Sequence, residues 1–179
     1  STAMTTERPV DLDRLSIEAV RDGALRGRSV TVLGFARSGI ALARFFADAG
    51  ARVTVYDGRP ASELGTAIDQ LEGRSVHLLA GPDVEPASAW AGAALVATSP
   101  SINPDYPTTE PRLRGALRAL VAARADAERD APALVSEPDL FLRLCPATTI
   151  GITGTKGKTT TSSLIAAILA TDPAHRAIL

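Results

Sequence analysis

The sequence contains a single cysteine, Cys145, so no disulfide bond can form within the chain. A chain that needs no disulfide fits a reducing compartment, and we therefore expect a cytoplasmic protein. Aromatic residues are also scarce, at 4% of the 179 residues. The core must consequently be built mainly from alanine, leucine, valine and isoleucine, within a hydrophobic content of 45%.

The sequence also lacks an excess of charge and long apolar runs. Its formal net charge is −1, which gives no support to a basic surface for nucleic acids or for anionic membranes. No apolar run approaches the roughly 20 residues that a membrane-spanning helix needs. The N-terminus does not have the basic and then apolar layout of a signal peptide. We therefore expect neither a nucleic-acid partner nor a membrane partner.

A β-strand, a helix and a second strand are predicted near the start of the chain. The β-rich run 29–33 ends at a glycine, and Ser38 is placed to cap a helix that stops at Gly50. The second β-rich run, 52–56, has Asp57 at its carboxyl end. Such a unit should have parallel strands and a right-handed crossover.

The alternation of helices and strands continues to residue 144. After a short leading helix at 11–22, further strands are predicted at 75–79, 94–97 and 133–135, and further helices near 62–73, 113–124 and 137–144. This pattern predicts an α/β protein with a Rossmann-like, mostly parallel sheet flanked by helices.

The turn 34–39 has the sequence Gly-Phe-Ala-Arg-Ser-Gly and leaves two interpretations open. A dinucleotide fingerprint requires glycine where Ala36 stands, although Asp57 lies at about the distance of the acid that binds the ribose. Because the methyl group of Ala36 would crowd a pyrophosphate, NAD is disfavoured. Two interpretations of this turn remain: it binds a different nucleotide in the same crevice, or it is a tight turn without a ligand. The polar turn 98–102 also follows a strand, at the edge where open α/β sheets bind ligands.

A second glycine-rich turn lies in the segment 148–170. An apolar run, predicted as a strand over 148–153, precedes the turn, and Lys158 and an apolar helix follow it. The strict P-loop spacing fails, because Ile152 stands where it needs glycine. A glycine-rich helix start with solvated lysines is the alternative. The order of strand, turn and helix favours a phosphate cradle in which Lys158 offsets charge and the Thr159 hydroxyl ligates Mg²⁺.

Several segments resemble one protein family. The sequence GITGTKGKTTT at 151–161 resembles the ATP loop of the Mur ligases, which join amino acids to a UDP-linked muramoyl precursor of the bacterial cell wall. Four more segments resemble the D-glutamate-adding members in the same order: VTVLGFARSGIALARFF at 30–46, VTVYDGR at 53–59, ATSPSI at 97–102 and SEPDLF at 136–141. The resemblance covers nearly the whole chain after its first residues.

The resemblance implies two binding sites. The UDP end of the substrate would be bound by Phe35, Ala36, Arg37 and Ser38 at the diphosphate, by Asp57, Gly58 and Arg59 near the uracil, and by Ser99 and Ser101 along the crevice. ATP would be bound by Gly154, Thr155, Lys156, Gly157, Lys158, Thr159 and Thr160, with Lys158 catalytic and Thr159 on the Mg²⁺ ion. Lys156 stands where the family most often has asparagine.

The implied activity is an ATP-dependent amide ligation of peptidoglycan precursor synthesis, which serves cell-wall biogenesis, cell shape and cell division. D-Glutamate would be added to UDP-N-acetylmuramoyl-L-alanine through an acyl phosphate. We expect residues 4–135 to be the N-terminal UDP-substrate-binding domain and 136–179 to be the start of a truncated central ATP-binding domain. Residues 1–3 are interpreted as the remnant of an expression tag. Such a fragment should be inactive alone.

One further consequence follows from this interpretation, and two alternatives to it stay open. In the whole ligase the strand and the apolar helix face after residue 148 would be buried in a larger sheet, and an unpaired edge and an apolar face favour association. We therefore expect this tail to be disordered, to fold back on the first domain, or to pair between chains in a self-association of the fragment. A non-catalytic nucleotide-binding or interaction module that keeps the loop for regulation is the first alternative. An NAD-dependent oxidoreductase is the second, and both Ala36 and the second glycine-rich turn argue against it.

Overall fold

The computed structural model describes residues 7–126, 131–174 and 176–178. The chain divides into two compact units, a first unit of residues 1–146 and a second unit of residues 147–179. Each unit is described by itself. The expected tag remnant at 1–3 lies outside the described residues.

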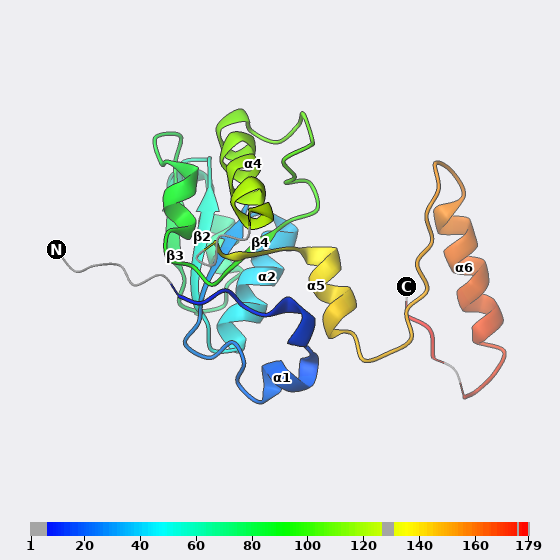
Figure 1. Cartoon of the computed structure of the whole chain (residues 1–179). Helices are drawn as coiled ribbons and strands as arrows, with labels where there is room; N and C mark the ends of the chain where they lie inside the picture. The colour runs from blue at the N-terminus through cyan, green and yellow to red at the C-terminus, as the bar shows by residue number, and fades with distance from the viewer. Residues whose placement is uncertain (1–6, 127–130, 175, 179) are drawn as a thin grey trace. The chain divides into compact units, whose positions relative to one another are not determined.

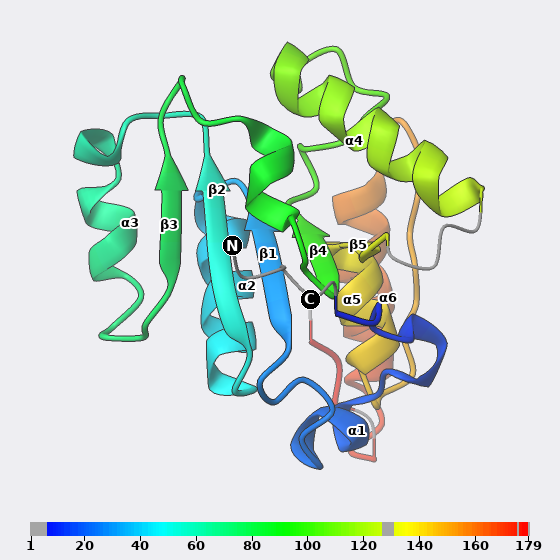
Figure 2. The ribbon, with the colours of Figure 1, turned by 60° about the vertical axis from the view of Figure 1, so that its left-hand side comes forward.

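The first unit is organised around a five-stranded sheet in the order β3-β2-β1-β4-β5 (Figure 2). Its strands are β1 Ser29–Leu33, β2 Arg52–Asp57, β3 His77–Ala80, β4 Leu95–Thr98 and β5 Ala133–Ser136. All neighbouring strands pair in parallel. The predicted Rossmann-like parallel sheet is therefore confirmed.

Helices cover both faces of this sheet (Figures 1 and 2). The helices of the first unit are η1 Leu12–Arg14, α1 Ile17–Arg21, α2 Arg37–Asp48, η2 Ala61–Glu63, α3 Gly65–Asp69, η3 Pro86–Trp90, α4 Pro111–Ala125 and α5 Glu137–Leu144. The predicted leading helix at 11–22 is thus two short helices, because the extended backbone of Leu15 and Ser16 separates them.

Alternate strand residues point into two separate cores, as the pleat of a strand requires. On one face, Val32 of β1 packs in a cluster with Phe46 of α2 and with residues of α5. On the other face, Leu33 packs in a cluster with Leu117 of α4 and Trp90 of η3. Most of the hydrophobic stabilisation of the first unit therefore comes from a sheet buried between two helical layers.

The order of the strands creates a switch point beside β1. From β1 the chain moves outward to β2 and β3, and then returns to the other side of β1 to form β4 and β5. The chain after β1 enters α2, which packs on one face of the sheet, and the chain after β4 leads to α4, which packs on the other face. Open α/β sheets bind ligands at the carboxyl ends of such strands, and we call the carboxyl ends of β1, β2 and β4 the crevice. This crevice lies where sequence analysis placed the UDP site.

The second unit contains α6 Lys158–Leu169 and the segment before it (Figure 1). The strand predicted over 148–153 is wrong, because residues 147–154 form no helix or strand. A strand needs a neighbour to satisfy its backbone hydrogen bonds, and no described strand pairs with this segment. Among the described residues, no helix is both long enough and apolar enough to cross a membrane.

Candidate functional site

Two glycines shape the turn that connects β1 to α2. Gly34 has a φ of +86°, and a Cβ atom on it would lie 2.7 Å from Cδ1 of Ile102 and 3.1 Å from Oγ of Ser99. A Cβ atom on Gly39 would lie 1.8 Å from the carbonyl oxygen of Gly34. These two glycines, to which no role was assigned from the sequence, occupy the first and third glycine positions of the fingerprint that brings a helix close to its strand.

The N-terminus of α2 opens onto the crevice. The helix begins at Arg37, with Ala36 as the N-cap, and no side chain of a described residue caps it. The predicted cap by Ser38 is therefore wrong, because the packing of Gly39 on Gly34 starts the helix directly after the turn. Arg37 is exposed and Ser38 is half-buried. The uncapped amides and the helix dipole make this end of α2 suitable for an anion.

The side chain of Phe35 points away from the crevice. The ring is 1% exposed and belongs to the hydrophobic core. Its backbone N–H donates a hydrogen bond of 2.8 Å to Oδ2 of Asp57. The side chain of Phe35 is thus a packing group, and only its backbone lies at the predicted binding turn.

Asp57 is hydrogen-bonded at both carboxylate oxygens. Oδ1 accepts from the backbone N–H of Arg59 at 2.9 Å and from its Nε at 3.0 Å. Oδ2 accepts from the Nη2 of Arg59 at 2.9 Å and from the N–H of Phe35 at 2.8 Å. The carboxylate and guanidinium therefore form a two-pronged pair, a geometry that strengthens charge-assisted hydrogen bonds.

These contacts determine the charge state of Asp57. Burial raises the pKa of its carboxyl group, but the hydrogen bonds from Arg59 and Phe35 and the positive charge of Arg59 outweigh burial and lower the pKa below its ordinary value. The pKa of Arg59 is raised, mainly by its hydrogen bond to Asp57. The pair is consequently ionised at neutral pH.

Ser99 and Ser101 have different environments in the loop after β4. Ser99 is buried, and its hydroxyl donates a hydrogen bond of 3.3 Å to the carbonyl oxygen of Leu33. It therefore ties the end of β4 to the end of β1. Ser101 is exposed, and its carbonyl oxygen accepts a bond of 3.4 Å from the hydroxyl of Thr109. The structure thus brings 35–38, 57–59 and Ser99 to the carboxyl edge of the sheet, with Ser101 on the adjoining loop.

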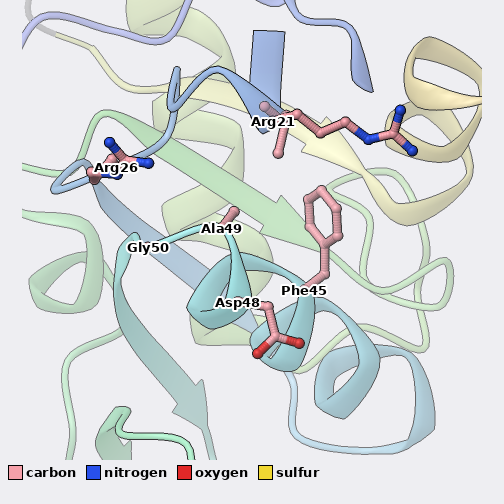
Figure 3. Close-up of a pocket in the computed structure, with 7 residues that line it drawn as sticks. Arg21, Arg26, Phe45, Asp48, Ala49 and Gly50 are labelled. Carbon is pink, nitrogen blue, oxygen red and sulfur yellow. The ribbon is translucent and has the colours of Figure 1, made fainter. Parts of the chain in front are cut away.

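Two of the cavities among the described residues of the first unit bear on ligand binding. One, of about 330 Å³, adjoins the crevice and is lined by residues of the β4–α4 loop, α4, β5 and α5, including Ser99 and Ser136. The other, of about 320 Å³, lies at the opposite edge of the sheet (Figure 3). It is lined by Val20, Arg21, Arg26, Phe45, Asp48, Ala49 and Gly50, none of which belongs to a predicted site.

The second predicted site is the loop before α6. Gly157 is the N-cap of α6 with a φ of +80°, and Gly154 has a φ of +151°. The Nζ of Lys158 donates to the carbonyl oxygen of Gly154. Residues 154–160, which include Thr155, Lys156, Thr159 and Thr160, are exposed. Two glycines with left-handed backbone followed by a lysine in the first helical turn fit a phosphate cradle.

The sheet order, the glycine-shaped turn and the acid after β2 place the chain in the Rossmann-like class of α/β folds. The chain is 39% identical over 146 residues to a UDP-N-acetylmuramoylalanine–D-glutamate ligase of Anaeromyxobacter dehalogenans. It is 38% identical over 140 residues to that of Trichlorobacter lovleyi and 36% identical over 140 residues to that of Geobacter metallireducens. These alignments cover 78–82% of the chain.

The chain is therefore a relative of the D-glutamate-adding Mur ligases, and the resemblance seen in its sequence is confirmed. It spans 27–28% of the length of these three relatives. No protein-family model matches the chain. Among solved structures, it is similar to the apo form of Escherichia coli D-lactate dehydrogenase, with 16% identity and a TM-score of 0.41 over 82% of this chain and 51% of the other.

Proposed function

We propose that the chain is the UDP-binding part of a ligase that adds D-glutamate to UDP-N-acetylmuramoyl-L-alanine, together with the start of its ATP-binding domain. The observation that carries this proposal is the 36–39% identity to ligases of that name over about four fifths of the chain. Residues 4–135 would form the UDP-substrate-binding domain, and residues 136–179 would begin the ATP-binding domain.

The crevice beside β1 has the chemistry that a nucleoside diphosphate needs. The uncapped N-terminus of α2 offers backbone N–H groups and the positive end of the helix dipole to a diphosphate. Arg37 is exposed in the first turn and adds a formal positive charge. Asp57, Gly58 and Arg59 follow β2, and we assign the base of the UDP group to their side of the crevice.

ATP and Mg²⁺ would bind at the loop before α6 in the whole ligase. The amides of 154–160 would surround the outer phosphates, Lys158 would offset their charge, and the hydroxyl of Thr159 would contact the Mg²⁺ ion. ATP supplies the phosphoryl group that activates the substrate carboxylate, and the amine of D-glutamate then forms the amide. Because most of the length of the relatives lies outside this chain, we expect the chain alone to bind without ligating.

Calorimetric titration of UDP into the 179-residue chain tests the proposal. We expect UDP to bind and Arg37→Ala to weaken binding about tenfold or more, since one charge-assisted contact contributes about 1.5–3 kcal/mol. Arg21→Ala is the matched control, because Arg21 is also exposed but lines the cavity at the opposite edge of the sheet (Figure 3). Binding of NADH in place of UDP, or equal effects of the two substitutions, would contradict the proposal.

A further inference from the structure

We propose that the cavity at the opposite edge of the sheet binds a small carboxylate that carries a flat apolar group. The ring of Phe45 contacts the flat group, and the guanidinium groups of Arg21 and Arg26 hold the carboxylate (Figure 3). The volume of the cavity, about 320 Å³, suits a small molecule. Because the crevice lies at the other edge, this inference does not depend on the proposed binding of UDP.

The cavity has a wall that backbone hydrogen bonds hold in place. Gly50, with a φ of +79°, turns the chain after α2, and its carbonyl oxygen accepts a bond of 2.8 Å from the N–H of Gly27. A second bond of 2.8 Å runs from the N–H of Arg52 to the carbonyl oxygen of Arg28. The stem of Arg26 lies against this turn, since a Cβ atom on Gly50 would be 3.4 Å from its Cγ. The loop before β1 and the end of α2 are thus joined without a ligand.

Arg21 and Arg26 have their charges available for an anion. Both residues are exposed, and neither side chain forms a hydrogen bond or an ion pair with another residue that the structure describes. Asp48 also lines the cavity, but its carboxylate accepts hydrogen bonds of 2.7 and 2.9 Å from Arg74. In Figure 3 this carboxylate points away from the two arginines. The positive charges of Arg21 and Arg26 therefore remain for a ligand.

Phe45 provides an apolar surface between these charges. Its side chain is half-buried, and its ring packs edge-on against Phe46, with the ring centroids 5.3 Å apart and the planes at 68°. In Figure 3 the ring of Phe45 lies between the guanidinium groups of Arg26 and Arg21. A flat apolar group can pack on such a ring while a guanidinium binds its carboxylate through two parallel hydrogen bonds.

The end of α2 favours a carboxylate over a phosphate. The helix ends at Asp48 with Ala49 as its C-cap, and both residues line the cavity. The C-terminus of a helix carries about half a negative charge, which repels an anion. Two guanidinium groups can offset this repulsion for a ligand with one negative charge better than for a dianion. The cavity differs in this respect from the crevice, where the positive end of the same helix faces the ligand.

NMR titration of the ¹⁵N-labelled chain with 1-naphthoate tests the inference. We expect the backbone amides of 21–26 and 45–50 to shift, with a Kd on the order of 1 mM for a ligand of this size. Two compounds with the same ring provide the comparison. 1-Naphthamide has no charge, and 1-naphthyl phosphate is mostly a dianion at about pH 7.5. Each should bind at least about fivefold more weakly than 1-naphthoate.

Substitutions of single arginines complete the test. Arg26→Gln and Arg21→Gln should each weaken binding of 1-naphthoate about tenfold, because each removes a charge-assisted contact, and should hardly change binding of 1-naphthamide. Arg14→Gln is the matched control. The side chain of Arg14 is 88% exposed and does not line the cavity, so this variant should bind as the unsubstituted chain does. All three side chains lie at the surface, so the variants should fold.

Four results would overturn the inference. The first is an absence of shifts in 21–26 and 45–50 with 1-naphthoate. The second is equal binding of 1-naphthamide, which would show that the carboxylate is not recognised. The third is tighter binding of 1-naphthyl phosphate, which would show a general anion site. The fourth is an Arg26→Gln variant that binds 1-naphthoate as well as Arg14→Gln does.

Discussion

The carbonyl oxygen of Gly34 lies 1.8 Å from the position that a Cβ atom on Gly39 would occupy. Gly34 begins the turn that joins β1 to α2 and Gly39 lies in the first turn of α2, so the helix rests directly on the backbone that follows the strand. No side-chain rotation can relieve this contact, because the neighbouring atom belongs to the main chain. The uncapped end of α2 is thereby held at the crevice.

Gly39→Ala should therefore destabilise the first unit by at least about 3 kcal/mol, since overpacking against backbone forces the helix to move. Gly115→Ala provides the opposite control. Gly115 lies inside α4, and a Cβ atom on it would meet nothing within 4 Å. We expect this second substitution to stabilise by about 0.5–1 kcal/mol. Urea unfolding followed by circular dichroism measures both. A Gly39→Ala chain as stable as the original would contradict the packing argument.

The Asp57–Arg59 pair should make stability depend on pH. Because the pKa of Asp57 is lowered by folding, its contribution is fully present above the ordinary aspartate pKa of about 4 and is lost as pH falls through the folded value. We expect Asp57→Asn to cost about 2 kcal/mol at pH 7 and much less at pH 2.5. Urea midpoints at the two pH values test this. A cost that is equal at both would show that ionised Asp57 adds no stability.

Lys158 should matter more than Lys156 for the binding of ATP. Lys158 starts α6 and reaches back to the loop through its bond to Gly154, whereas Lys156 lies in the exposed loop before the helix. In the chain, Lys158→Ala should weaken ATP binding about tenfold or more, and Lys156→Asn should change it less than about twofold. Fluorescence titration with a labelled ATP analogue measures both. If the Lys158→Ala chain bound ATP with undiminished affinity, the assignment of this loop as an ATP site would be wrong.

The apolar side chains of α6 should promote self-association. Leu164 and Ile168 are each 60% exposed and lie on one side of the helix. Replacing both with aspartate should lower the weight-average mass in light scattering at high concentration. Ala166→Asp, about opposite these two residues on the helix, is the control and should have little effect. A chain that is monomeric at every concentration before any substitution would contradict the expectation.

The sheet could be predicted well from the sequence because the residue patterns that indicate its strands are local. Runs such as 29–33 and 52–56 are rich in β-branched residues and stop at glycine or aspartate, so each strand and its position could be read directly. The strand expected over 148–153 failed for a physical reason. Its residues suit a strand, but a strand forms only when a neighbour completes its hydrogen bonds, and the described residues provide none.

The sequence predicted which residues lie at the carboxyl edge of the sheet, but not the contacts that they make there. Asp57 was recognised from its distance along the chain, yet its contact with Phe35 joins residues that only the sheet brings together. The burial of Ser99 and its bond to Leu33 likewise depend on the pairing of β4 with β1. Which side chains remain free for a ligand is thus a property of tertiary structure.

Titration of UDP into the ¹⁵N-labelled chain, followed by NMR through the shifts of its backbone amides, tests the account most directly. We predict that the shifts concentrate on residues 35–38, 57–59 and 99–101 at the carboxyl edge of the sheet. The residues around the cavity at the opposite edge, such as Arg26 and Gly50, should not respond (Figure 3). Shifts confined to that opposite edge, or no shifts at all with UDP while NADH moves the amides of 34–39, would contradict the account.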